Sequence, residues 1–169
     1  SFANQDLPPL HRTSVGVNAT LPAVTPDQVT AVLAKFGEFS TVKIKVAETG
    51  QPISADVLRV LEVVRSYPDC RIRLDANGNF TPEQALELLA KIPLDRLDYF
   101  EQPCATLDEL VELRKTIAHL KLGVLIAADE SIRKAADPLE VARRNAADIV
   151  MLKVQPLGGI ERCLEIAKQ

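Results

Sequence analysis

Hydrophobic and polar residues alternate along the chain in several short runs, and one run is unusual. In RIRLD, which ends at Asp75, the two arginines and the aspartate fall on one face of an extended strand, and Ile72 and Leu74 fall on the other. A strand buried in a parallel sheet is expected to be almost continuously apolar. We therefore expect the charged face to point into the mouth of a barrel and the apolar face to pack on helices.

The same patterns predict the other elements. The expected strands are 14–21, 41–46, 71–75, 97–101, 123–129 and 148–153. The expected helices are 26–36, 54–66, one that begins at 82, 107–118, 137–144 and 160–168. Threonines at 25, 81 and 106 are placed to open three of these helices. In the second helix the apolar residues at helical spacing are Val57, Leu58, Leu61 and Val64.

These elements alternate as six strand–helix units of roughly 25–30 residues, a length typical of parallel strands joined by crossover helices. A doubly wound sheet and a TIM barrel both produce this alternation. No glycine-rich phosphate-binding loop follows the first expected strand, which counts against a nucleotide-binding sheet.

Charged residues mark the ends of five consecutive expected strands. Lys45, Asp75, Glu101, Asp129 and Lys153 each lie at or next to the carboxyl end of a different strand. In a TIM barrel these ends form the rim that carries the active site, whereas in an open sheet they lie along a line and cannot converge. The sequence therefore predicts an α/β fold, a TIM-type (β/α) barrel of which six strand–helix units are present.

The three acidic residues of this set predict a metal site. Asp75, Glu101 and Asp129 come from adjacent expected strands, so their carboxylates can meet. Without a cation they would repel one another and their pKa values would rise. Mg²⁺, with Mn²⁺ as an alternative, favours such oxygen ligands. A zinc site is not expected, because no histidine or cysteine is near these positions in a ligand pattern.

Lysines stand on both sides of the acidic set. Lys43 and Lys45 share a face, so each disfavours the charge of the other, and we expect a lowered lysine pKa. A neutral Lys45 could take a proton from a carbon beside a carboxylate, with the metal holding the negative charge of the enediolate. Lys153, on the opposite side, could act as an acid or as a cation that stabilises the intermediate.

Composition and charge exclude several partners. Hydrophobic residues make up 47% and charged residues 25%, as in ordinary globular proteins. The net charge is −3 with both signs mixed, which argues against nucleic acid, and no apolar run approaches the roughly 18 residues of a membrane span. Three scattered cysteines, Cys70, Cys104 and Cys163, indicate a reduced cytoplasmic protein, with Cys104 an inert thiol. His11 and His119 are interpreted as surface residues.

Five short motifs carry a family resemblance. They are KIK at 43–45, DAN at 75–77, EQP at 101–103, ADES at 128–131 and LK at 152–153. With them the chain resembles the enolase superfamily, in its muconate-lactonizing-enzyme subgroup, for which a lysine base with Mg²⁺ is the established pattern. The strings VNATLPAV, KIKVAETGQ, FEQPCAT, IAADESIRKAADPL and LKVQPLGGI are more similar to the o-succinylbenzoate synthase family of actinobacteria.

The resemblance, which runs from about Ser14 to the end of the chain, implies a function. It implies a carbon–oxygen lyase of menaquinone biosynthesis that dehydrates the small carboxylate SHCHC, a cyclohexadiene dicarboxylate, to o-succinylbenzoate. In this family Lys45 would remove the α-proton, the three acidic residues would bind Mg²⁺, and Lys153 would be the cationic partner across the ring. Arg73 and Asn77 would orient groups around the metal and Glu130 would partner a lysine, although Arg73 and Glu130 fit equally well as members of salt bridges that line the barrel.

The resemblance also implies missing parts. Members of the family have a capping domain and a barrel of seven or eight strands, so we expect this chain to be a piece of a longer protein. Residues 1–13 are interpreted as a lead-in from the absent capping domain and residues 14–169 as a partial barrel domain. Two unpaired edges of such a piece would favour association.

Two alternatives stay open at this point. An N-acylamino acid racemase, a dipeptide epimerase or a cycloisomerase of the same subgroup would share the arrangement of lysines around a metal. A catalytically silent fragment that binds metal weakly is the alternative from a different functional class.

Overall fold

The computed structural model describes residues 13–169. The expected lead-in, apart from Thr13, and His11 lie outside these residues. The described chain forms one six-stranded sheet with the order β1-β2-β3-β4-β5-β6. The strands are β1 (Ala19–Leu21), β2 (Thr41–Lys45), β3 (Arg71–Asp75), β4 (Leu97–Glu101), β5 (Ile126–Ala128) and β6 (Ile149–Val150).

Every strand pairs in parallel with the next strand of the sequence. The order never reverses, as it would at the switch point of a doubly wound sheet, so the winding is that of a barrel. The sheet is not closed within the described residues. The prediction of six parallel strand–helix units in a partial barrel is therefore confirmed.

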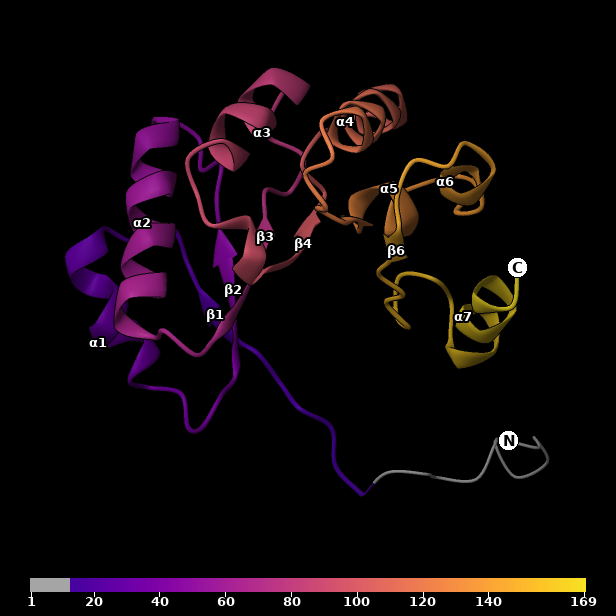
Figure 1. The fold of residues 1–169 in the computed structure, drawn as a ribbon. Coiled ribbons are helices and arrows are strands. Elements are labelled where there is room, and N and C mark those ends of the chain that lie inside the picture. Colours follow the sequence, from indigo (N-terminus) through magenta and orange to yellow (C-terminus); the bar gives the residue numbers. More distant parts are fainter. Residues whose placement is uncertain (1–12) are drawn as a thin grey trace.

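The helices lie along the outer side of the curved sheet (Figure 1). They are η2 (Pro26–Gln28), α1 (Val29–Leu33), α2 (Ile53–Ser66), α3 (Pro82–Leu89), η3 (Leu94–Arg96), α4 (Leu107–His119), α5 (Glu130–Arg133), α6 (Glu140–Arg143) and α7 (Ile160–Ala167). Thr81 and Thr106 open α3 and α4 as predicted, because each hydroxyl accepts the amide of the residue three positions later.

The hydrophobic core lies between the sheet and these helices. Ile72 and Leu74 of β3 are fully buried in it, as the alternation of β3 predicted. Phe100 of β4, Leu88 of α3 and Leu113 of α4 belong to the same cluster and are also fully buried. Each such side chain contributes roughly 1.5–3 kcal/mol relative to an exposed one, so this layer holds the strands in place.

One irregularity in the sheet sets the positions of the residues at its rim. Leu97 pairs with Ile72, but the next partner of β3, Arg73, pairs with Tyr99, so Asp98 is an extra residue in β4. Leu97 and Phe100 can both face the core for this reason, although they are three residues apart. Without the extra residue, every following side chain of β4 would face the opposite way.

The buried face of α2 differs from the prediction. Leu58 is 56% exposed and Leu61 is 40% exposed, whereas the core-facing stripe contains Val60, Val63 and the charged pair Asp56 and Arg59. Val57 and Val64 pack against the core in agreement with the predicted periodicity, but Leu58 and Leu61 do not, because two members of the buried stripe are charged.

This buried pair connects α2 to the end of β2. Arg59 donates to Asp56 (2.6 Å) and to the carbonyl oxygen atoms of Lys45 (3.0 Å) and Val24 (2.6 Å). Asp56 in turn accepts the amide of Ala47 at 2.9 Å. The main chain from the carbonyl of Lys45 to the amide of Ala47 is therefore fixed by a charged pair in the core.

Several predicted boundaries were too long, mainly at the edges of the sheet. The strands expected over 14–21, 123–129 and 148–153 shorten to three, three and two residues. Val15, which precedes the edge strand β1, is 73% exposed. The helix expected at 137–144 begins only at Glu140, since Asp137 accepts the amide of Leu139 and forms a turn.

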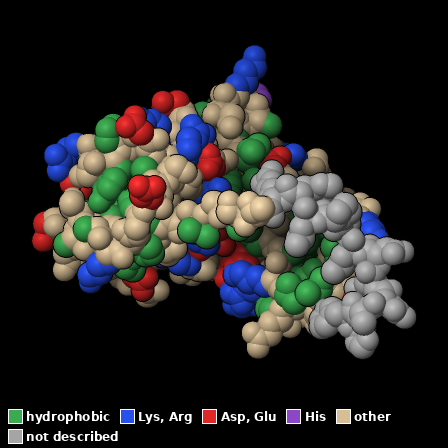
Figure 2. All heavy atoms as spheres, turned by 90° about the horizontal axis from the view of Figure 1, so that it is seen from below, with side chains coloured by type: hydrophobic (Ala, Val, Ile, Leu, Met, Phe, Trp, Pro, Cys, Tyr) green, Lys and Arg blue, Asp and Glu red, His purple; other side chains and the backbone are tan. Residues whose placement is uncertain are grey.

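The surface carries mixed charge. Figure 2 shows acidic and basic side chains interspersed with apolar ones on the face seen from below. Among residues 13–169, no helix is long and apolar enough to cross a membrane.

Replacement of Arg59 tests the buried pair. We expect Arg59→Met to lower the free energy of unfolding by about 3–5 kcal/mol, because Asp56 is left as an uncompensated buried carboxylate. Thermal and urea unfolding followed by circular dichroism measure this loss. Arg65→Met on the same helix removes an exposed ion pair with Glu62 and should leave the midpoint nearly unchanged. Equal losses in both variants would contradict the role given to Arg59.

Candidate active site

The pairing register places three of the predicted residues in one row. Lys45 is the partner of Asp75 across β2 and β3, and Asp75 is the partner of Glu101 across β3 and β4. Asp129 directly follows β5, and Lys153 follows β6. All are at the same end of the sheet, because parallel strands bring their carboxyl ends to one rim.

The backbone anchors three of these residues before the next loop begins. Val46, Ala76 and Gln102, which follow Lys45, Asp75 and Glu101, donate their amides to carbonyl oxygen atoms of the next strand at 3.0, 3.2 and 2.7 Å. Ala47, Asn77 and Gln102 then take positive φ angles of 61°, 48° and 34°. The chain thus leaves the sheet abruptly, immediately after the residue with the functional side chain.

Asp75 and Glu101 share one cation. The ammonium of Lys43 lies 2.8 Å from Asp75 and 2.7 Å from Glu101, and the ammonium of Lys45 lies 2.6 Å from Asp75. Both carboxylates are 1% exposed, whereas the two lysine side chains are partly exposed. A pair of buried carboxylates on adjacent strands is therefore brought together as predicted, with a lysine between them.

Asp129 forms the other part of the rim. Its Oδ2 accepts from Lys153 Nζ at 2.7 Å and from Arg133 Nε at 3.3 Å. Its Oδ1 is buried and has no hydrogen-bond partner. Among residues 13–169, no three acidic, histidine or cysteine side chains are gathered closely enough to hold a metal. The metal triad of Asp75, Glu101 and Asp129 thus stays a prediction.

The donor set nevertheless suits a hard divalent cation. The three carboxylates are buried, accept only, and come from adjacent strands. The buried oxygen of Asp129 lacks the partner that a carboxylate in the protein interior normally has. Oxygen ligands of this kind are those that Mg²⁺ prefers.

Burial and charge shift the pKa values in different directions. Burial disfavours the charge of Asp75, but hydrogen bonds from Lys43 and Lys45 outweigh it and lower the pKa of Asp75. Burial raises the pKa of Glu101, and the nearby carboxylates of Asp75 and Asp129 add to the effect. The expected rise in carboxylate pKa therefore holds for Glu101 and is wrong for Asp75, because the lysines act as the missing cation.

The expected lowering of a lysine pKa is wrong for Lys43. Burial disfavours the charged form of Lys43. Its hydrogen bonds to Asp75 and Glu101 together outweigh burial and raise the pKa of Lys43. Repulsion between neighbouring lysines is therefore overcome by the carboxylates on the next two strands.

A chain of polar contacts connects the two sides of the rim. Lys45 donates to Asn77 (2.7 Å), and Asn77 donates to Glu130 (3.2 Å). Arg133 then contacts both Glu130 and Asp129. Asn77 thus lies beside Lys45, while Glu130 has Arg133 and Asn77 as its described partners and reaches Lys45 only through Asn77.

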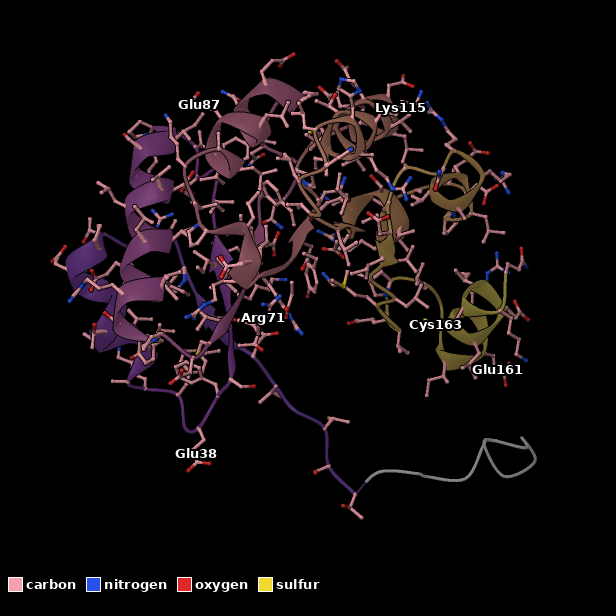
Figure 3. All side chains as sticks on the ribbon, viewed as in Figure 1. Glu38, Arg71, Glu87, Lys115, Glu161 and Cys163 are labelled. Carbon is pink, nitrogen blue, oxygen red and sulfur yellow. The ribbon has the colours of Figure 1, made fainter. Side chains whose placement is uncertain are left out.

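Arg73 is engaged elsewhere. Its guanidinium lies 3.3 Å from Asp98, 3.2 Å from Asn18 and 5.0 Å from the ring centroid of Tyr99. These contacts match the alternative in which Arg73 belongs to a salt bridge that lines the barrel. Figure 3 shows the neighbouring Arg71 on the inner side of the curved sheet, away from the outer helices.

Two further residues at the rim, Arg133 and Gln102, were not predicted from the sequence. Arg133 is on α5, a short helix that was not predicted, four residues after Asp129 and three after Glu130. That spacing from two acidic residues was the available signal.

Cys104 is buried, and burial raises the pKa of its thiol to about 12, which fits the inert thiol predicted. His119 is exposed, as expected.

Known proteins share both sequence and fold with this chain. The model of the family described as enolase C-terminal domain-like matches residues 25–169. An o-succinylbenzoate synthase of Mycolicibacterium smegmatis is 49% identical over 168 residues, which cover 99% of this chain and 50% of the relative. One of Mycobacterium tuberculosis is 50% identical over 161 residues, which cover 95% and 47%. The chain therefore spans about half the length of the curated relatives it matches.

Solved structures agree on the fold. A mandelate racemase/muconate lactonizing family protein from Azoarcus has a TM-score of 0.74 and 32% identity, covering 91% of this chain and 41% of that one. An enolase superfamily member from Roseovarius nubinhibens, complexed with magnesium, has a TM-score of 0.72 and 29% identity, covering 91% and 40%. A dipeptide epimerase from Enterococcus faecalis has a TM-score of 0.76 and 28% identity, covering 91% and 45%.

The raised pKa of Glu101 predicts how the metal-free protein responds to pH. Protonated Glu101 contributes its full stability below its unfolded pKa of about 4.3, and this contribution is lost as pH rises through the higher folded pKa. We expect the thermal midpoint with EDTA to fall between pH 4.5 and 7, and Glu101→Gln to reduce this fall and to raise the midpoint at pH 7.

Asp75 affects stability in the opposite sense, because its folded pKa is lowered. Its contribution to stability is lost only as pH falls below about 4, which is outside this window. Glu87→Gln, at the outer surface of α3 (Figure 3), is the matched control and should keep the wild-type slope. A lower midpoint for Glu101→Gln at pH 7 would contradict the prediction.

Proposed function

We propose, on the premise that this chain belongs to the enolase C-terminal domain-like family, that it carries the metal and acid–base residues of an o-succinylbenzoate synthase. The complete protein would be a cytoplasmic lyase of menaquinone biosynthesis that converts SHCHC to o-succinylbenzoate and water. Relatives of that name at 49–50% identity support this choice of reaction.

The observation that carries the proposal is the placement of two lysines on opposite sides of buried carboxylates. Lys45 contacts Asp75 at one end of the rim, and Lys153 contacts Asp129 at the other. A substrate lying over the carboxylates would therefore have an amine on each flank. Asp75, Glu101 and Asp129 would hold Mg²⁺ or Mn²⁺, which when bound stabilises negative charge on a substrate carboxylate.

Lys45 is proposed as the base. Its Nζ takes the α-proton of the substrate, and the electron pair left on the ring expels hydroxide from the adjacent carbon. The ammonium of Lys45 returns the proton to that hydroxide, so that water leaves and the ring becomes aromatic. Asn77 accepts a hydrogen bond from Nζ at 2.7 Å and orients the amine. Lys153 provides a fixed positive charge on the opposite flank.

A second candidate follows from the structural neighbour that is a dipeptide epimerase. With the same two lysines, one amine could remove a proton and the other return it on the opposite face, which gives racemisation or epimerisation. Rates of SHCHC dehydration and of N-succinyl amino acid racemisation, measured on one preparation of the complete protein, separate the two. Racemisation without dehydration would overturn the synthase proposal.

Replacement of Lys45 tests the base. We expect Lys45→Ala in the complete protein to lower kcat for SHCHC dehydration by at least about 10²–10⁴-fold, while Mg²⁺ binding stays intact. Lys91→Ala, which removes an exposed lysine of a surface ion pair, is the control and should keep wild-type kcat. Near-wild-type turnover in Lys45→Ala would remove Lys45 from this role.

Replacement of Asp75 tests the metal site and the alternative of a silent fragment. Isothermal titration with Mg²⁺ should show binding that is lost in Asp75→Asn, because the amide carries no negative charge and one ligand oxygen is replaced. Asp95→Asn, in the outlying turn η3, should bind as the wild type does. Absence of Mg²⁺ binding by the wild-type complete protein would contradict a metal-dependent enzyme.

A further inference from the structure

Gln102 has a buried side chain in which every hydrogen-bonding group is used. Its Oε1 accepts from the backbone amides of Asp129 (3.0 Å) and Ser131 (3.1 Å). Its Nε2 donates to the carbonyl oxygen of Cys104 (2.9 Å) and to the hydroxyl of Ser131 (2.7 Å). Because two backbone donors face one end of the amide and a carbonyl faces the other, only this orientation of the amide satisfies all four contacts.

The main chain of Gln102 adds two more connections. Its amide donates to the carbonyl of Ala127 at 2.7 Å, and its carbonyl accepts the amide of Gly78 at 2.7 Å. One residue therefore joins the turn after Asp75, the end of β4 and the loop that begins at Asp129. Its φ of 34° is a conformation that a glutamine keeps only where its surroundings fix it.

The partners of Gln102 are the residues next to the proposed ligands. It follows Glu101 in the chain, and its side chain holds the amide of Asp129 itself. An amide side chain thus bridges the two strand ends that carry these carboxylates. Asp129 Oδ1 is one of two buried side-chain oxygen atoms without a hydrogen-bond partner among the described residues, the other being Glu130 Oε2, and the orientation of Asp129 decides where its oxygen points.

We propose that Gln102 is a positioning residue that fixes Asp129 relative to Glu101 for joint binding of a divalent cation. This inference rests on the proposed function, because it assumes that these carboxylates bind a metal. An amide is the side chain that suits the task, since it both accepts and donates without adding charge. A glutamate would keep the acceptor that faces Asp129 and Ser131 but lose the donors, and a methionine would lose both.

The test is Mn²⁺ affinity, measured by electron paramagnetic resonance and isothermal titration on the complete protein. We expect Gln102→Met to weaken Mn²⁺ binding about 10–100-fold, the usual effect of losing a group that orients a metal ligand. Gln102→Glu, which retains the acceptor toward the Asp129 amide, should recover most of the loss. The rescue separates positioning of Asp129 from a general effect of altering a buried residue.

Leu113→Ala is the control for lost stability. Leu113 is fully buried on α4 in the core between the sheet and the helices, so its truncation lowers the thermal midpoint. We expect its Mn²⁺ affinity to stay within about twofold of wild type. If Gln102→Met yields no folded protein, the test uses Ser131→Ala, which removes the hydroxyl acceptor of Nε2. We then expect Mn²⁺ affinity to fall by at least about threefold.

The outcomes separate this inference from the proposed function. Wild-type binding of Mn²⁺ together with unchanged binding in folded Gln102→Met, or in Ser131→Ala where that variant is used, overturns the inference alone. Failure of the wild type to bind Mn²⁺ overturns the proposed function and this inference with it. Equal losses in Gln102→Met and Leu113→Ala would also overturn the inference, because the effect would then follow stability.

Discussion

The arrangement of the rim depends on the register of one strand pair. Glu101 lies opposite Asp75 only because Asp98 is an additional residue in β4. With regular pairing, Phe100 would take that place and Glu101 would turn toward the helices. One register of β3 and β4 must therefore place apolar side chains in the core and acidic side chains at the rim at the same time.

The buried charges at the rim are compensated, but not equally. Lys43 stands between two buried carboxylates and compensates them unequally. Asp75 has two lysines and a lowered pKa, whereas burial and the nearby acidic groups leave Glu101 with a raised pKa. Such imbalance is common where charged groups are gathered for function and not for stability.

Much of the fold and of the rim could be predicted from the sequence, because the alternation of strands and helices and the alternation of side chains along a strand follow simple rules. The bounds of β3 and β4 match the predicted ones, β2 ends one residue earlier than predicted, and the charged face of β3 followed from alternation. The core-facing side of α2 did not, since Asp56 and Arg59 are buried and periodicity counts only apolar residues. The bulge at Asp98, the helix α5 and the contacts of Arg133 depend on tertiary pairing that local patterns do not contain.

Backbone hydrogen bonds to the next strand follow directly after Lys45, Asp75 and Glu101. Val46, Ala76 and Gln102 are tied to the neighbouring strand before any loop begins. The main chain at Lys45, Asp75 and Glu101 is therefore held by the sheet, whereas Asp129 and Lys153 lie in the segments that follow β5 and β6. Changes of length or sequence farther along the loops after β2, β3 and β4 can therefore alter which substrate fits without moving these three strand ends.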